Sequence, residues 1–264
     1  MNCPACSLLL GVMMLAFSSC SAVPDSLTQA PQPSTAIPPS ATPTIVWFPP
    51  SETPTAQALP TQGPTPERKP GVGRVLLADD FSSRDAWNPG VSEEASIEIS
   101  GNRMTFAAQP GITAFRVRKE PVLTSFYAEV TARPSLCRNG DEYGLLFRAP
   151  TSVAYYSYAV SCNGASYVAR VRFGRPVVLH AAVPSADAPV GAPGEVRLGV
   201  WVSGPDMRFF LNGNYQFGAS DPTYKLGAVG LFARSAGDTP VTVSFSDLSI
   251  YSVSYTAPSA TPTP

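Results

Sequence analysis

The chain offers few side chains in an arrangement that suits catalysis. Hydrolysis of a glycosidic bond uses two carboxylates that flank the bond, and on a strand only residues at alternate positions share a face. The adjacent pairs Glu93-Glu94 and Asp141-Glu142 therefore point to opposite faces of any strand that holds them. The chain has no Gly-x-Ser-x-Gly, no His-Glu-x-x-His and no Asp-rich calcium loop. His180 has no partner and is expected to be structural. The sequence predicts no catalytic residue, no metal site and no cofactor.

A cysteine follows the apolar run near the N-terminus. Leu8–Phe17 is ten residues long, about half of a membrane-spanning helix, so it is expected to be the core of a signal peptide. The next residues, Phe17-Ser-Ser-Cys20, resemble a bacterial lipobox, with Phe17 where Leu is preferred and no Lys or Arg in residues 1–6. The resemblance implies a lipoprotein signal over 1–20 and a lipid on Cys20 that anchors the protein to a bacterial membrane. The alternative is an ordinary secretory signal cut near Ala22.

The prolines divide the chain. Of 29 prolines, 13 lie between Pro24 and Pro70, and residues 71–255 hold only 12. Segments dense in Pro, Ser and Thr bury too little apolar surface to offset the entropy of ordering. We therefore expect a disordered linker over 21–73, a folded domain over 74–255 and a disordered tail over 256–264. On a lipid anchor, such a linker would display the domain outside the cytoplasm, at the cell surface.

Two cysteines remain for the mature chain, Cys137 and Cys162. In an exported protein such a pair predicts a disulfide, here closing a loop of about 25 residues. Two free buried thiols are the alternative.

The folded domain reads as strands and turns. Apolar and polar residues alternate in Phe126–Thr131, in Arg197–Ser203 and around Phe209, with Trp201 on the nominally outer face. The apolar phase changes between Phe245 and Leu248, which predicts a bulge or bend near Ser246-Asp247. Ten to thirteen strands in about 180 residues predict an all-β fold, a two-sheet antiparallel sandwich.

Several motifs along this domain resemble one superfamily. They are Asp79-Asp-Phe-Ser82 with Trp87, Phe126-Tyr-Ala-Glu-Val130, Tyr143-Gly-Leu-Leu-Phe-Arg148, Tyr155-Tyr-Ser-Tyr158, Phe209-Phe-Leu-Asn-Gly213, Gly227-Ala-Val-Gly-Leu231 and Phe245-Ser-Asp247. In this order they are similar to the concanavalin A-like (laminin-G-like) jelly rolls, and most similar to bacterial 3-keto-disaccharide hydrolase-like domains. The resemblance implies a jelly roll over nearly all of 74–253. The paired carboxylates of jelly-roll glycosidases have no counterpart here.

Three residues are candidates for ligand binding. In the resembled family a Gly-apolar-apolar-apolar-Arg strand lies near the ligand cleft, which makes Arg148 a candidate; the alternative is a structural arginine that pairs with a carboxylate. Tyr156 and Tyr158 share one side of a strand and offer faces for stacking on sugar rings, with Tyr155 on the other side. One of these sides must be core, and the sequence does not say which. Arg170 and Arg172 share a face that we interpret as a solvated basic stripe.

The charge balance limits the partners. The net charge is −1, and residues 74–253 hold 16 basic and 16 acidic side chains. A domain without net positive charge is not expected to bind nucleic acid. The sequence favours a non-catalytic module that binds carbohydrate or another cell-wall or extracellular polymer, preferably a neutral one. The alternatives are a glycoside hydrolase like the 3-keto-disaccharide hydrolases, and a structural or protein-interaction module.

Overall fold

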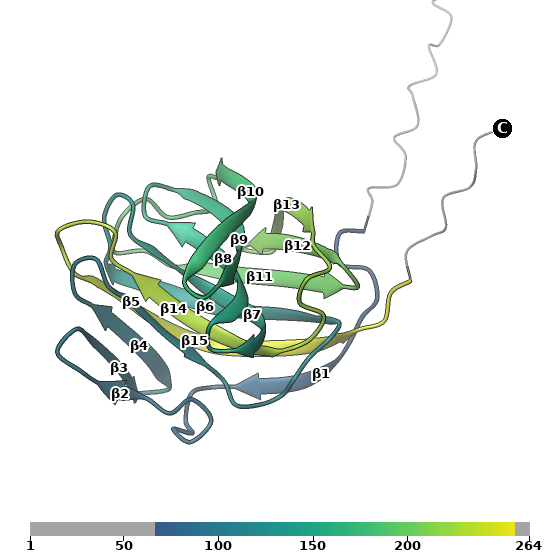
Figure 1. The fold of residues 1–264 in the computed structure, drawn as a ribbon, viewed down its shortest axis with the longest axis horizontal. Helices are drawn as coiled ribbons and strands as arrows, with labels where there is room; N and C mark the ends of the chain where they lie inside the picture. Colours follow the sequence, from purple (N-terminus) through teal and green to yellow (C-terminus); the bar gives the residue numbers. More distant parts are fainter. Residues whose placement is uncertain (1–66, 257–264) are drawn as a thin grey trace, which may run out of the picture. The chain divides into compact units, whose positions relative to one another are not determined.

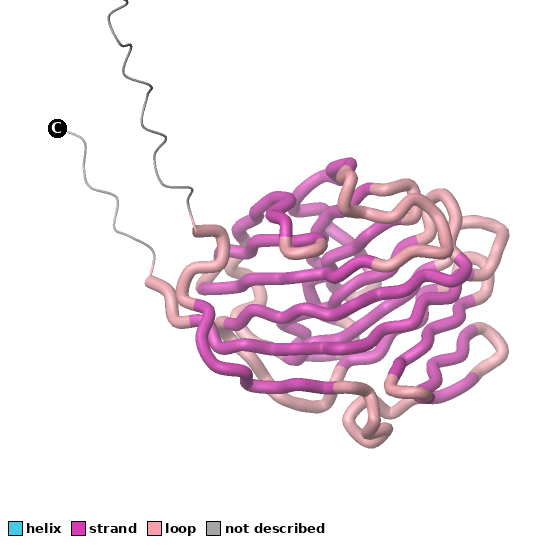
Figure 2. Tube along the Cα trace, turned by 180° about the vertical axis from the view of Figure 1, so that it is seen from behind, coloured by secondary structure: helices cyan, strands magenta, loops and turns pink. Residues whose placement is uncertain are grey.

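The computed structural model describes residues 67–256, which form strands and loops without a helix (Figure 1 and Figure 2). These residues accordingly contain no helix long and apolar enough to cross a membrane. The predicted signal segment 1–20 with Cys20, most of the predicted linker and the tail from residue 257 lie outside the described residues. The first strand begins at Val72, two residues before the expected start of the domain.

The strands form two antiparallel sheets stacked as a jelly-roll sandwich, as predicted (Figure 1). The nine-stranded sheet has the order β13-β12-β11-β6-β15-β4-β3-β2, with β1 also paired to β15. Its strands are β1 (Val72–Asp79), β2 (Gly90–Val91), β3 (Ala95–Ser100), β4 (Arg103–Ala108), β6 (Phe126–Leu136), β11 (Val196–Ser203), β12 (Asp206–Leu211), β13 (Asn214–Ser220) and β15 (Val241–Val253). The six-stranded sheet has the order β10-β9-β8-β7-β14-β5. Its strands are β5 (Thr113–Val117), β7 (Glu142–Thr151), β8 (Ala154–Ser161), β9 (Ala165–Arg172), β10 (Arg175–Pro184) and β14 (Ala228–Arg234).

The core lies between the inner faces of the two sheets. Val200 of β11 pairs with Ala128 of β6, and both are fully buried, as the alternation predicts. In β15, Ser246 pairs with Thr131 but Ser249 pairs with Glu129, so β15 holds one residue more than β6 between these pairs. This is the predicted bulge, and it returns both Phe245 and Leu248 to the core.

Residues 67–70 cover an aromatic strip on the outer face of the nine-stranded sheet. Trp201 is fully buried on this face, and its indole N–H donates to the carbonyl of Pro70 at 3.0 Å. The ammonium of Lys69 lies 4.7 Å from the ring centres of both Tyr127 and Phe210. The guanidinium carbon of Arg68 lies 4.5 Å from the ring centre of Tyr215. Cations over aromatic faces are attracted by the ring quadrupole. The end of the predicted linker is therefore part of the folded domain.

The predicted disulfide is present between Cys137 and Cys162, whose Cα atoms are 5.9 Å apart. Cys137 follows β6 of the nine-stranded sheet, and Cys162 follows β8 of the six-stranded sheet. The bond therefore joins the two layers at one end of the sandwich.

We expect the double substitution Cys137→Ala/Cys162→Ala to lower the free energy of unfolding by about 3.5 kcal/mol, because the unfolded chain regains the freedom of a loop of about 25 residues. Denaturant titration of the full chain followed by fluorescence measures this. Wild-type protein treated with a reductant should shift by a similar amount, and a midpoint unchanged by either treatment would contradict the prediction.

Candidate functional site

A groove crosses the outer face of the six-stranded sheet. Its volume is about 280 Å³, and all six strands of the sheet or their turns contribute to its lining, from Phe115 on β5 to Pro176 on β10. Six flat strands would span about 24 Å at the usual strand spacing. The groove is therefore elongated and runs across the strands.

Aromatic side chains give the groove its apolar character. Phe115, Tyr155, Tyr167 and Phe232 line it, and they pack around Leu146 in a cluster separate from the main core. The rings of Phe115 and Tyr155 lie 6.1 Å apart at a tilt of 41°. Phe115, Tyr155 and Tyr167 are only partly buried. Part of their surface is thus available to a ligand.

A polar cluster lies in the same groove. The carboxylate of Glu142 is 3.3 Å from the guanidinium of Arg234 and accepts a hydrogen bond from the hydroxyl of Tyr167 at 3.0 Å. Burial raises the pKa of Glu142 above its ordinary value, against the opposing charge of Arg234. The arrangement offers a carboxylate acceptor, a guanidinium donor and a hydroxyl beside apolar rings. These are the groups with which a pocket fixes the orientation of a polar ligand.

Asp141 does not enter the groove. Its carboxylate turns into the loops and accepts the backbone N–H groups of Arg138 and Ala236, each at 2.9 Å. The two adjacent carboxylates diverge because Glu142 begins β7, whereas Asp141 lies in the turn before that strand. Glu142 is the one carboxylate that lines the groove in the part of the chain that the structure describes.

The prediction that Tyr156 and Tyr158 form a stacking platform for sugar rings is wrong. Both side chains are fully buried, because this side of β8 faces the nine-stranded sheet. The ring of Tyr156 stacks on Phe147 at 5.3 Å, and that of Tyr158 packs on Phe209 at 4.8 Å. Tyr155, on the other side of the strand, is the tyrosine of β8 that lines the groove.

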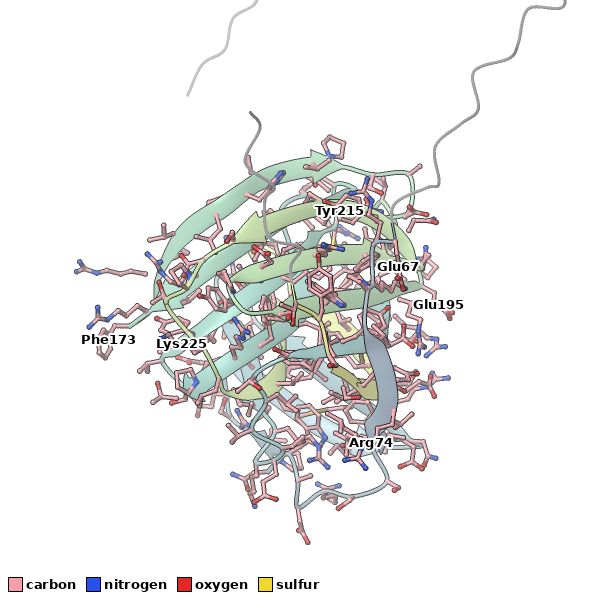
Figure 3. The ribbon with its side chains drawn as sticks, turned by 90° about the vertical axis from the view of Figure 1, so that its right-hand side faces the viewer. Glu67, Arg74, Phe173, Glu195, Tyr215 and Lys225 are labelled. Atoms are coloured by element: carbon pink, nitrogen blue, oxygen red, sulfur yellow. A yellow bond between two sulfur atoms is a disulfide. The ribbon has the colours of Figure 1, made fainter. Side chains whose placement is uncertain are left out.

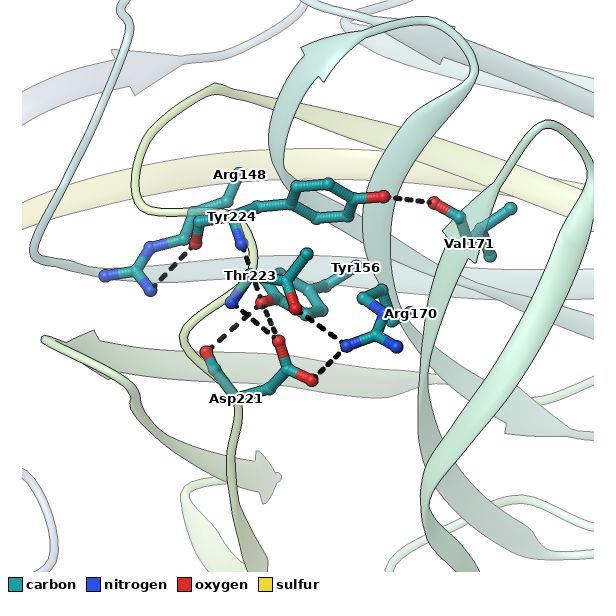
Figure 4. A network of polar contacts seen from close by, with 7 residues as sticks. All are labelled: Arg148, Tyr156, Arg170, Val171, Asp221, Thr223 and Tyr224. Carbon is teal, nitrogen blue, oxygen red and sulfur yellow. Dashed lines mark hydrogen bonds and ion pairs between the residues drawn. The ribbon is translucent and has the colours of Figure 1, made fainter.

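Arg148 is also buried, with 2% of its surface exposed, at the end of the sandwich shown in Figure 4. Its guanidinium donates to the carbonyls of Thr124 (3.1 and 2.6 Å), Gly204 (2.7 Å) and Tyr224 (3.2 Å). The structural alternative is supported, but its expected partner is wrong, because Arg148 pairs with carbonyl oxygens of three loops and not with a carboxylate. Burial lowers the pKa of Arg148. Arg148 also lines a hollow of about 320 Å³ together with Lys225, so its predicted contact with a ligand stays a prediction.

The loop of residues 221–224 joins Tyr156 to Arg148. The hydroxyl of Tyr156 donates to Asp221 Oδ1 at 2.7 Å and accepts the backbone N–H of Tyr224 at 3.0 Å (Figure 4). Arg170 donates to Asp221 Oδ2 at 2.5 Å, so it is not part of a solvated stripe, whereas Arg172 is exposed. The structure thus brings Arg148 and Tyr156 together, but around loop 221–224. Tyr158 does not take part in these contacts.

Asp221 is the central acceptor of this loop, and no sequence motif singles it out. Burial, the largest effect, acts to raise the pKa of its carboxyl. Hydrogen bonds from Thr223 and Tyr156, together with the charge of Arg170, outweigh burial and lower the pKa below the ordinary value.

His180 lies on β10 away from these groups. Its ring stacks on Phe217 at 4.3 Å, and Nδ1 lies 2.9 Å from the carbonyl of Ala181. Within residues 67–256 no group of three or more His, Cys, Asp or Glu side chains is placed to bind a metal ion.

No protein-family model and no curated protein matches this chain. Solved structures do match its fold. The carbohydrate-binding module CBM66 from Bacillus subtilis has 16% identity and a TM-score of 0.50, and the match covers 63% of this chain and 96% of that one. The catalytic domain of an endo-1,3-β-glucanase (laminarinase) from Thermotoga petrophila RKU-1 has 8% identity and a TM-score of 0.51, with coverages of 69% and 98%.

A third match comes from work on endo-acting O-glycanases that prominent members of the human gut microbiota express to initiate mucin breakdown. It has 13% identity and a TM-score of 0.51, and it covers 69% of this chain and 100% of that one. At these identities the matches show the fold alone, a two-sheet antiparallel jelly-roll sandwich.

We expect Asp221→Asn to destabilise the domain by about 2 kcal/mol at neutral pH, because it weakens charge-assisted hydrogen bonds from Arg170 and Tyr156. A carboxyl whose pKa is lowered by folding stabilises the fold above its unfolded pKa, and this contribution is lost as pH falls through the folded pKa. Unfolding curves of both proteins should therefore converge below about pH 4. A difference that does not change between pH 7 and pH 2 would refute this account.

Proposed function

We propose that this protein is a non-catalytic carbohydrate-binding protein whose ligand lies in the groove of the six-stranded sheet. The observation that carries the proposal is the set of partly exposed aromatic side chains beside the Glu142–Arg234–Tyr167 cluster. Rigid aromatic rings supply contact area at little entropic cost, and a few fixed polar groups orient the ligand. The fold supports the proposal as well, since CBM66 is described as a carbohydrate-binding module.

A glycoside hydrolase of the 3-keto-disaccharide type is the second candidate. One observation favours it: the raised pKa of Glu142 suits a general acid. The usual mechanisms, however, place a second carboxylate about 5–10 Å away, as nucleophile or as base. Asp141 turns away from the groove, and its hydrogen bonds hold it there. Binding without hydrolysis is therefore the function that the groove supports best.

We further propose that the protein is exported and anchored to a bacterial membrane through a lipid on Cys20. The support is the apolar run that ends at Phe17-Ser-Ser-Cys20 and the proline-rich segment that follows. The disulfide between Cys137 and Cys162 fits the same location, because such bonds persist in oxidising compartments.

Tyr155→Ala should weaken binding of the full chain to its glycan about tenfold, because a buried tyrosine contact is worth more than about 1 kcal/mol. A glycan array identifies the ligand, and calorimetry measures the affinity. Tyr155→Phe keeps the ring and should retain most of the affinity. Tyr215→Ala removes an exposed tyrosine from the other sheet and serves as the matched control. Equal affinity of the wild type and Tyr155→Ala would place the ligand elsewhere.

Cys20→Ala should release the protein from the membrane fraction of the cells that produce it, since the acyl chains on the cysteine are the proposed anchor. Fractionation followed by immunoblotting measures the distribution, and incorporation of labelled palmitate tests the lipid directly. If the wild type is already released, the secretory alternative cut near Ala22 is correct. If the variant stays on the membrane, Cys20 is not the anchor.

A further inference from the structure

The turn between β9 and β10 holds a phenylalanine in an unfavourable backbone conformation. Phe173 and Gly174 both have left-handed backbone conformations, with φ of 49° and 72°, in a two-residue turn between the paired Arg172 and Arg175. Turns of this type favour Asn or Gly at the first position, because a bulky residue with positive φ is strained. The Phe173 side chain is nevertheless 70% exposed. Neither the turn nor the core accounts for a phenylalanine here, and strain of this kind is a feature of binding sites.

Cations flank this ring. The guanidinium carbon of Arg172 lies 5.6 Å from the centre of the Phe173 ring, and Arg175 follows the turn on the other strand. Neither arginine has a carboxylate within ion-pair distance among residues 67–256, whereas Arg170, deeper in the sheet, is paired with Asp221. Figure 3 shows Phe173 at the edge of the molecule.

The turn borders a hollow of about 670 Å³. The side of β9 that carries Arg172 contributes to it, together with Phe173, Arg175 and the loop residues Thr223 and Tyr224. The next residue of this loop, Lys225, lines the neighbouring hollow with Arg148, which the four carbonyl contacts leave without a counter-ion. No carboxylate lines this second hollow. The domain has balanced charges, but the charged side chains that line the two hollows without an ion pair are all positive.

We propose that this end of the sandwich binds an acidic polysaccharide. A sugar ring packs on Phe173, and its carboxylate or sulfate groups bind Arg172 and Arg175, with Lys225 in reach of a neighbouring group. The proposal rests on the proposed function and adds the ligand class and a second site, which adjoins the groove at Gly174. A hollow with hydroxyl and guanidinium donors suits a polar chain. A turn that inserts into a membrane would need only an exposed apolar cluster, and the arginines beside Phe173 would then have no role.

The test compares polymers that differ only in charge. Full-length protein should bind polygalacturonate and not the fully methyl-esterified polymer, and salt should weaken the binding. Dextran sulfate against dextran tells whether sulfate replaces carboxylate. Arg172→Ala and Arg175→Ala should each weaken binding about tenfold, the effect of losing one charge-assisted hydrogen bond. Arg103→Ala, an exposed arginine beside the turn Gly101-Asn102, is the matched control and should bind normally.

Phe173→Asn separates binding from folding. Asn suits the left-handed position, so the melting temperature should stay equal or rise while binding to polygalacturonate falls; a lower melting temperature with unchanged binding would overturn the proposal. Binding to phosphatidylglycerol vesicles that depends on Phe173, without binding to either acidic polymer, would assign the turn to a membrane and overturn it too. Neutral glycans that bind through Tyr155, together with no preference for acidic polymers, would refute this inference and leave the groove intact. No binding to any glycan refutes both.

Discussion

The packing of the two sheets on each other sets the position of the functional side chains. Each strand turns alternate side chains toward the core, so the side chains between them must lie on the outer face of the sheet. In β8 the core takes Tyr156 and Tyr158, which leaves Tyr155 on the outer face, in the groove. In β11 the core takes Val200 and Val202, which leaves Trp201 outside, where residues 67–70 cover it. The groove is thus made from the residues that the core does not use.

Where the sheets end, buried polar groups take over from apolar packing. Arg148 donates to carbonyls of three separate loops. Asp221 accepts hydrogen bonds from Tyr156 and from the charged Arg170. Backbone carbonyls in irregular loops need donors when they are buried, and a guanidinium supplies up to five from one side chain. The same contacts fix the loop that separates the two cationic hollows. The shape of that end of the molecule therefore depends on groups whose main role is structural.

The sequence was sufficient for features that are local or that follow from alternation. It predicted the sandwich, the bulge after Phe245 and the disulfide. It could not decide which side of Tyr155–Tyr158 is core, because tyrosines lie on both sides of the strand and the sheet that covers it is distant in the chain. Asp221 and the partners of Arg148 were missed for the same reason: their contacts join residues 24 to 76 positions apart. Because basic and acidic residues are equal in number, the sequence also did not indicate that unpaired cations line the two hollows.

The contacts that hold residues 67–70 on the outer face of the nine-stranded sheet have a mechanical consequence. Lys69 lies between two rings, Trp201 holds the carbonyl of Pro70, and Gly71, whose φ of 70° allows close approach, accepts the backbone N–H of Ser254. Tension applied to the chain at Glu67 would load these contacts before it reaches the ladder of β1 and β15. The contacts of residues 67–70 therefore stand between a pull on the N-terminal segment and the paired strands of the sandwich.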